Sequence, residues 1–534
     1  MAAAKRESTG RHAFLVAAGI LISRLVGLVR QHFVSRYLGL QNDPADAWNQ
    51  AFTIPNFLQN LFGEGVLSAS FIPVYARLLA QGDEREAGKV AGAIAAILAC
   101  VTSCIVLVGV LATPVFVDAF APGFHGAKRD LTIRIVRILF PGSGLLVLSA
   151  WCLGVLNSHR KFFLSYIAPV MWNVSMIATL LSFGSTVGES RLAVLLAWGS
   201  LVGSALQLGV QLPVVIALVR QLRLNTDTRA SDVHEVIRNF VPVFISRGVV
   251  QISALVDRML SSLLPTGAVT GLANAQLLYT LPVSLFGMAV SAAELPAMSS
   301  ALGSEAEVAV YLRRRLNAGL RQIAFFIVPS AMAFLALGDV VAGAIFVSGK
   351  FRPEDARYVW GIVAGSAVGL LASTLGRLYS STYYALRDTR TPLRFAVIRV
   401  VLTTALGYLC ALPLPVVLGI PQRWGVAGLT ASAGVAGWVE FTLLRRTLNA
   451  RIGTTGLPAS FVARLWIAAA AAAGTAWAAR FAIGHHRPIV VAVPVLGVYG
   501  IVYFGVAYLL RVEECVGTLE RVARFTSIGR RPTS

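Results

Sequence analysis

The sequence predicts an all-α polytopic membrane protein, and three observations support this prediction. Of the 534 residues, 56% are hydrophobic and only 13% are charged. About fourteen apolar segments, each long enough to cross a bilayer, fill almost the whole chain. The connections between these segments are too short to hold a soluble domain.

The expected transmembrane helices follow one another with short connections, so neighbouring helices should lie adjacent and antiparallel. Several are longer than the ~20 residues that a crossing needs, which predicts tilted or bent helices. The first segment continues into polar sequence without a cleavage site, so we expect it to remain as a helix. The expected segments are 12–36, 46–78, 88–117, 130–156, 161–184, 192–219, 236–264, 269–302, 317–347, 356–386, 392–418, 424–448, 459–483 and 488–511.

The formal net charge of +21 comes from Lys and Arg that gather in alternate connections. The triplet Arg313–Arg315 and the pair Arg445 and Arg446 are examples, whereas the opposite connections hold few basic residues. This bias places both termini in the cytoplasm and favours anionic lipid headgroups. We therefore interpret the basic excess as a topology signal and exclude nucleic acid as a partner.

A sequence repeat divides the chain into two halves. Ser23-Arg24 recurs as Ser246-Arg247, Thr53–Pro55 as Thr280–Pro282, and Arg160 as Arg390, at offsets of 223, 227 and 230. Each match lies six segments from its copy, which predicts parallel repeats around an axis along the membrane normal. We expect a first six-helix lobe (1–222), a second (223–450), two further helices (451–511) and a cytoplasmic tail (512–534).

Arginines inside the apolar segments predict a cavity for an anion. Arg24, Arg247 and Arg377 lie well within expected helices, where an arginine costs at least about 2.5–3.5 kcal/mol. Such residues persist where they face water or a counter-charge, and we predict that these three contact the substrate. Arg399 is also deep, but local pairing or snorkelling would explain it equally well.

The second segment is unusually polar for a membrane helix. It carries Asp46, Asn56 and Glu64 and is interrupted by Pro55, so it should line protein or water rather than lipid. We predict that these three residues, and Arg30 of the first segment, also contact the substrate. In the seventh segment, Asp257 could neutralise a neighbouring arginine or coordinate a cation. We expect no metal centre and no cofactor. The sequence has no P-loop and no catalytic constellation, so transport is favoured over catalysis.

Several motifs together resemble one protein family. They are Ser23–Arg30 (SRLVGLVR), Asp46-Ala47, Ile54–Asn56, Leu61–Gly65, Ser68–Pro73, Ala121–Phe124, Leu295-Pro296 and Tyr384–Pro392. The block from the first two segments is the most specific, and the similarity extends over essentially the whole chain. The sequence resembles the MurJ (MviN) family of bacterial lipid II flippases in the MOP exporter superfamily.

This resemblance implies fourteen helices in two lobes around a cationic central cavity, with the last two helices forming a lipid-facing groove. It also implies alternating access that carries the undecaprenyl-pyrophosphate-linked peptidoglycan precursor from the inner to the outer leaflet of the bacterial cytoplasmic membrane. The cell-wall synthesis machinery is a possible partner. By position, Arg24 and Arg30 match functional arginines of the family, Asp46 and Glu64 match its acids, and Arg377 matches a basic position.

The sequence departs from the family pattern at two cavity arginines, which are replaced by Gln59 and Gln276. The positions of a family sodium site on the eleventh helix are Thr403 and Gly407, so the resemblance gives little support for sodium coupling. Two alternatives stay open: a MOP-type exporter of another anionic lipid-linked oligosaccharide, and a membrane scaffold that does not transport.

Overall fold

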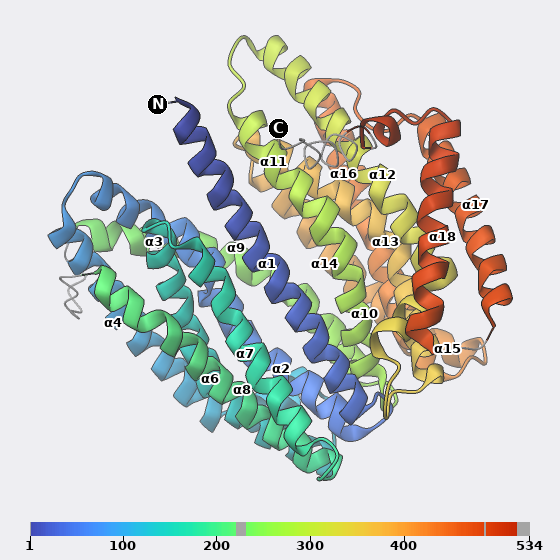
Figure 1. Cartoon of the computed structure of the whole chain (residues 1–534), viewed down its shortest axis with the longest axis horizontal. Coiled ribbons are helices and arrows are strands. Elements are labelled where there is room, and N and C mark those ends of the chain that lie inside the picture. Colours follow the sequence, from blue (N-terminus) through green and yellow to red (C-terminus); the bar gives the residue numbers. More distant parts are fainter. Residues whose placement is uncertain (1, 220–230, 485–486, 519, 521–534) are drawn as a thin grey trace, which may run out of the picture. The chain divides into compact units, whose positions relative to one another are not determined.

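The computed structural model describes residues 2–219, 231–484, 487–518 and 520, and helices make up nearly all of it (Figure 1). The α-helices are α1 (Ala2–Leu38), α2 (Asp43–Phe62), α3 (Glu64–Ala80), α4 (Glu84–Leu111), α5 (Thr113–Phe120), α6 (Gly126–Ser158), α7 (Phe162–Phe183), α8 (Glu189–Leu218), α9 (Ser231–Ser262), α10 (Ala268–Pro282), α11 (Ala289–Ser299), α12 (Glu305–Phe346), α13 (Pro353–Ala385), α14 (Arg390–Ala411), α15 (Pro413–Val417), α16 (Gly425–Ile452), α17 (Ala459–Ile483) and α18 (Pro488–Leu509).

Each predicted segment corresponds to a helix or to a run of helices, which confirms the all-α fold class. Eleven helices or helix runs in the described residues are long and apolar enough to cross a membrane. The other three predicted spans fall on α1, on α2 with α3, and on α9. Side chains in parts of α1 and α9 lie outside the described residues, α2 is polar and α3 has only 17 residues, so the count of fourteen spans stays a prediction.

The chain folds into two compact units. Unit 1 comprises Met1–Thr270 with Ser348–Phe351, and unit 2 comprises Gly271–Val347 with Arg352–Ser534. Helix α9, the expected start of the second lobe, packs against α3 and belongs to unit 1. The boundary between the compact units therefore differs from the lobe boundary at 222/223 that the sequence repeat predicts. The lobe boundary stays a prediction about the repeat.

The same backbone turn follows α6 and α13. Arg160 after α6 and Arg387 after α13 both have positive φ, 59° and 57°. In each case the next residue donates its N–H to the carbonyl five positions back, Lys161 to Leu156 and Asp388 to Tyr383. Arg387 lies 227 residues after Arg160, the offset that relates Thr53 to Thr280. The same turn also follows α18, at Arg511 with φ of 54°, so it is a common helix end and does not by itself identify the repeat.

Pro329 interrupts the backbone hydrogen bonding of α12, and tyrosine hydroxyls of α18 bond to carbonyls at this place. Because proline has no N–H, the carbonyl of Phe325 loses its helical donor. The buried hydroxyl of Tyr503 donates to this carbonyl at 2.6 Å, and that of Tyr499 donates to the Pro329 carbonyl at 2.7 Å. Helix α18 is thus fastened to α12 within unit 2.

At a second irregularity in α12, side chains of other helices also donate hydrogen bonds to the backbone carbonyls. Leu337 has non-helical φ and ψ of −128° and 15°. The indole of Trp360 in α13 donates to the Phe334 carbonyl at 3.1 Å, and that of Trp477 in α17 donates to the Ala336 carbonyl at 2.9 Å.

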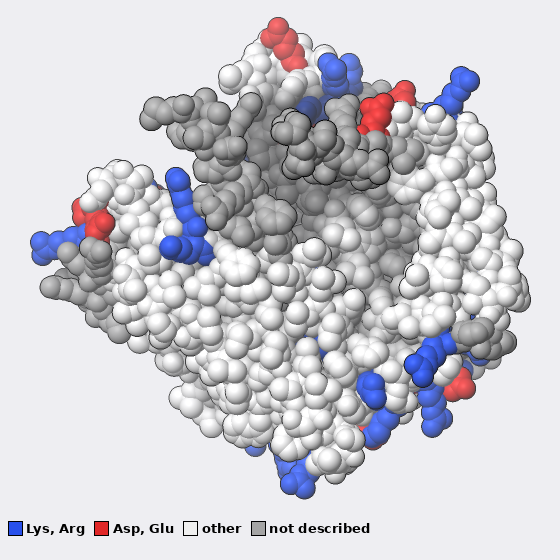
Figure 2. Space-filling view, in the orientation of Figure 1, with Lys and Arg blue, Asp and Glu red and all other residues white. Residues whose placement is uncertain are grey.

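Charged side chains gather near helix ends, whereas the visible surface along the helices is largely uncharged, as a surface facing lipid requires (Figure 2).

Candidate functional site

Arg30 lies in the interface between α1 and α7 of unit 1. Its guanidinium carbon is 4.8 Å from the ring centroid of Trp172, a cation–π contact. The Trp172 indole is fixed from two sides, because its N–H donates to Ser200 Oγ at 3.0 Å and Phe52 stacks on it at 5.7 Å. The buried Nε of Arg30 has no hydrogen-bond partner among the described residues, so this guanidinium retains capacity for an anionic ligand.

A polar pocket lies beside this arginine within unit 1. Its empty volume is about 260 Å³, part of which is open to the surroundings. Asn56 and Gln59 of α2 reach it beside the break that Pro55 makes in the helix. Its lining consists of Phe52, Pro55, Asn56, Gln59, Leu139, Gly142, Ser143, Leu146, Trp172, Ser200 and Ser204. Amides and hydroxyls inside a membrane helix bundle mark a place that water or a polar ligand group can enter.

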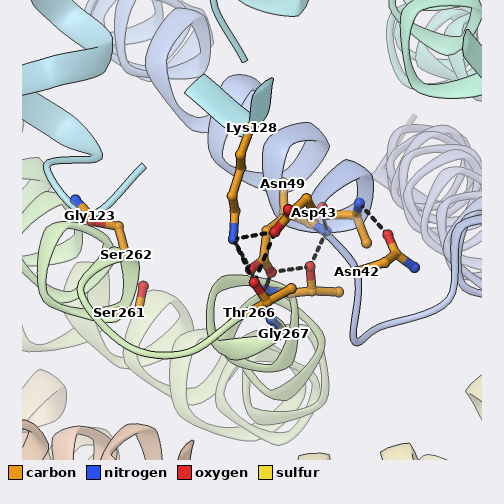
Figure 3. Close-up of polar contacts among 12 residues, drawn as sticks. Asn42, Asp43, Asn49, Gly123, Lys128, Ser261, Ser262, Thr266 and Gly267 are labelled. Carbon is orange, nitrogen blue, oxygen red and sulfur yellow. Dashed lines mark hydrogen bonds and ion pairs between the residues drawn. The ribbon is translucent and has the colours of Figure 1, made fainter. Parts of the chain in front are cut away.

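Asp46 is 1% exposed and forms the centre of a hydrogen-bonded network at the other end of α2. Figure 3 shows residues around this network, among them Asp43, Lys128 and Gly267. Its carboxylate accepts from the backbone N–H groups of Gly267 at 2.8 Å and Thr270 at 2.9 Å, and from the Thr270 hydroxyl at 2.7 Å. Lys128 Nζ lies at 2.9 Å. Asp46 therefore caps the first turn of α10 and neutralises a largely buried lysine. Contact with a substrate would require this network to open.

The motif Ala121–Phe124 has a structural explanation in the same region. Gly123 donates its N–H to Ser262 Oγ at 3.3 Å, and a Cβ on Gly123 would lie only 2.0 Å from the Ser262 carbonyl oxygen. Glycine is therefore required for this close approach. The Phe124 ring then lies 4.4 Å from Lys128 Nζ and shields one side of the lysine that pairs with Asp46.

Two of the deep arginines discussed above, Arg377 and Arg399, lie in unit 2. Arg377 is exposed on α13 between the buried residues Gly376 and Leu378. Arg399 forms an ion pair with Glu440 of α16 at 3.1 Å, so local pairing accounts for this deep arginine.

For the other predicted site residues, the structure gives only the helix and, for some of them, the exposure of the side chain. Arg24 is exposed on α1, which is continuous through Gly27. Asp257 is half-buried on α9. Glu64 begins α3 and Arg247 lies within α9, but both side chains fall outside the described residues. Convergence of Arg24, Arg247 and Arg377 on one ligand stays a prediction.

The family model described as lipid II flippase MurJ matches residues 34–498, which is most of the chain. The match leaves out most of α1, with Arg24 and Arg30, and the second half of α18. The chain belongs to the MurJ lipid II flippase family. A probable lipid II flippase MurJ of Rhizobium meliloti is 30% identical over 442 residues, covering 81% of this chain and 79% of that protein. The lipid II flippase MurJ of Burkholderia cenocepacia is 30% identical over 446 residues, covering 82% and 84%.

Solved structures agree on the fold of this MurJ family member. A lipid II flippase MurJ in an inward closed conformation matches with a TM-score of 0.76 at 20% identity, covering 93% of this chain and 99% of that one. An inward-facing MATE multidrug transporter of the MOP superfamily matches with a TM-score of 0.62 at 16% identity, covering 83% and 100%.

Sequence reasoning overlooked two residues of this MurJ family member. Lys128 was read only as a charge in a connection, although its place after the Ala121–Phe124 motif and the acid-rich start of α2 could have suggested a pairing. Trp172 gave no signal, because an aromatic residue in an apolar helix is unremarkable in sequence. In the described residues no group of three or more His, Cys, Asp or Glu could hold a metal ion.

Proposed function

We propose that this protein flips the lipid-linked peptidoglycan precursor, lipid II, from the inner to the outer leaflet by alternating access. The observation that carries the proposal is the family match over residues 34–498, which spans both compact units. The protein is then a transporter rather than a catalyst. The polar pocket and the incompletely bonded Arg30 in unit 1 support a role in holding a polar, anionic headgroup.

In this proposal the substrate's pyrophosphate is held by arginines of the first helix. Arginine presents a planar fork that binds phosphate oxygens in pairs, and it remains charged at membrane depth. Trp172 keeps the guanidinium of Arg30 in the α1–α7 interface by the 4.8 Å ring contact. Arg24, on the exposed surface of α1, would make the first contact, and Arg247 and Arg377 would add charge from the other helices.

We further propose that the protein resides in the bacterial cytoplasmic membrane with both termini in the cytoplasm. The support is the unequal distribution of Lys and Arg among the connections. In this orientation the Asp46 network lies towards the outer face, and the Arg313–Arg315 triplet at the start of α12 lies towards the cytoplasm. The cell-wall synthesis machinery at the outer face would consume the flipped precursor.

Complementation of a bacterial strain with conditional depletion of its own lipid II flippase tests this function. We expect the wild-type chain to restore growth, Arg30→Ala to abolish rescue at normal membrane abundance, and Arg30→Lys to restore it only partly. Arg36→Ala is the matched control, because Arg36 lies on the same helix but is exposed. Failure of the wild-type chain at normal abundance would reject lipid II as the substrate.

One observation favours a second candidate, the export of another anionic lipid-linked oligosaccharide. Gln59 lines the pocket of unit 1 where the family pattern has an arginine, which reduces the positive charge beside Asn56. A headgroup with fewer negative charges would suit this pocket. Binding of purified protein to lipid II and to the bare polyprenyl pyrophosphate would separate the candidates, because only a lipid II flippase should distinguish the two.

A further inference from the structure

The connection between α16 and α17 in unit 2 is a rigid loop, residues 453–458. Thr455 is 2% exposed, and both its N–H and its hydroxyl donate to Asn449 Oδ1. Its hydroxyl also lies 2.9 Å from the Tyr379 hydroxyl of α13. From α12, Asn317 Oδ1 accepts from the Gly456 N–H at 3.0 Å. Three helices thus fix the backbone of this short loop.

Two guanidinium groups lie directly against the two glycines of this loop. A Cβ on Gly453 would be 2.8 Å from Arg313 Nη1, and a Cβ on Gly456 would be 2.6 Å from Arg445 Nη2. Both glycines have positive φ, 86° and 129°. Arg445 Nε also donates to the Thr455 carbonyl at 2.9 Å. Because the glycines are three residues apart, their Cα atoms are separated by at most about 11 Å.

These two arginines keep their charge uncompensated. Neither Arg313 nor Arg445 has a carboxylate within ion-pair distance in the part of the chain that the structure describes. Arginines nearby in sequence do have such partners, since Arg315 pairs with Glu294 at 2.8 Å and Arg451 with Asp388 at 2.7 Å. Among the described residues, the two positive charges beside this loop therefore have no carboxylate partner.

We expect the loop to lie at the level of lipid headgroups, because it connects two membrane-spanning candidates. It joins two helices that are each long and apolar enough to cross the membrane, Gln422–Ile452 with its short preceding turn and Ala459–Ile483. Along α17 the side chains of Ile467 and Phe481 are exposed, as expected for a helix in contact with lipid. Helix α12 has 42 residues and is about 63 Å long, so its first turns, with Arg313, extend beyond the ~30 Å hydrocarbon core.

We propose that Arg313, Arg445 and the loop 453–458 form a binding site for the phosphate of an anionic phospholipid of the surrounding bilayer. Fixed guanidinium groups bind phosphate oxygens through charge-assisted hydrogen bonds, and a headgroup phosphate is the anion present at this depth. Phosphatidylglycerol is a lipid of this class and serves as the probe. The site is separate from the Arg30 region in unit 1 and does not depend on the proposed flippase function.

Native mass spectrometry of the full-length protein, titrated with phosphatidylglycerol or phosphatidylcholine, tests the site. Arg313→Gln with Arg445→Gln should weaken phosphatidylglycerol binding about tenfold or more, because each removes hydrogen bonds to a charged group. The matched control is Arg314→Gln with Arg446→Gln, which removes the adjacent exposed arginines and should change the affinity by less than about twofold. Phosphatidylcholine should bind weakly and equally to all variants.

Arg313→Gln alone keeps the test valid if loss of Arg445 disturbs the loop, because Arg445 also bonds to the Thr455 carbonyl. This single variant should retain the wild-type melting temperature and still lose affinity. Equal losses in both double variants would show a general charge effect and overturn the site, as would an unchanged affinity. Tighter binding of polyprenyl pyrophosphate than of phosphatidylglycerol at this site would overturn the assignment to a bilayer phospholipid.

Discussion

Replacing Asp46 by alanine should destabilise unit 1 strongly. The substitution removes the acceptor for two backbone N–H groups and one hydroxyl and leaves Lys128, whose side chain is 12% exposed, without its closest carboxylate. Breaking a buried pair by removing one partner costs about 3–5 kcal/mol. Asp43 remains 3.2 Å from Lys128 Nζ, so we expect a value near the lower limit, about 3 kcal/mol.

The assay is unfolding in mixed detergent micelles, followed by tryptophan fluorescence, for single and double variants. Lys128→Met and Asp46→Ala should be non-additive, with a coupling free energy of about 1–3 kcal/mol. Asp43→Ala is the control, because that side chain is 55% exposed and should cost less than about 1 kcal/mol. A loss for Asp46→Ala no larger than that of the control, or additive effects of Asp46 and Lys128, would refute this account.

Three further outcomes are expected. Gln59→Arg should leave abundance and melting temperature unchanged because the side chain lines the unit 1 pocket, and loss of folded protein would show that the pocket cannot accept the charge. Tyr503→Phe should lower stability by about 1–3 kcal/mol, because the Phe325 carbonyl is left buried without a donor, and unfolding titrations measure this loss. Hydrogen bonds from Thr391 and the ion pair with Arg451 lower the pKa of Asp388 from 3.8 to about 2. The Asp388→Asn variant should therefore melt below the wild type above about pH 4, and the difference should disappear as the pH falls to about 2. A difference in melting temperature that does not depend on pH would contradict this.

The helical segments could be predicted from sequence because lipid imposes a simple constraint. Every backbone polar group in the bilayer needs an internal partner, so apolar length alone identifies helices such as α17 and α18. The breaks in these helices are less predictable. The sequence shows that Pro329 has no N–H to donate. Only the structure shows that the Tyr503 hydroxyl of α18 donates to the Phe325 carbonyl instead.

The sequence predicts which kinds of residue form the site, but it predicts only partly what each residue does there. A deep arginine such as Arg399 satisfies the same sequence criterion as Arg30, yet one pairs with Glu440 and the other lies on Trp172. Asp46 was predicted as a substrate contact, and its bonds to Gly267 and Thr270 could not be foreseen. These partners are more than two hundred residues away in sequence, and no local pattern reports such a distance.

The most direct test of the proposed function is the accessibility of lipid II at the outer face of cells that depend on this protein for growth. An enzyme that cleaves lipid II only from outside should release its soluble product when the wild-type protein is present. Release should fall to the background of flippase-depleted cells when Arg30→Ala replaces it at equal abundance, while total lipid II accumulates. Unchanged outer-face cleavage in the depleted cells, or full cleavage with Arg30→Ala, would contradict the central claim that this chain moves lipid II through a site that includes Arg30.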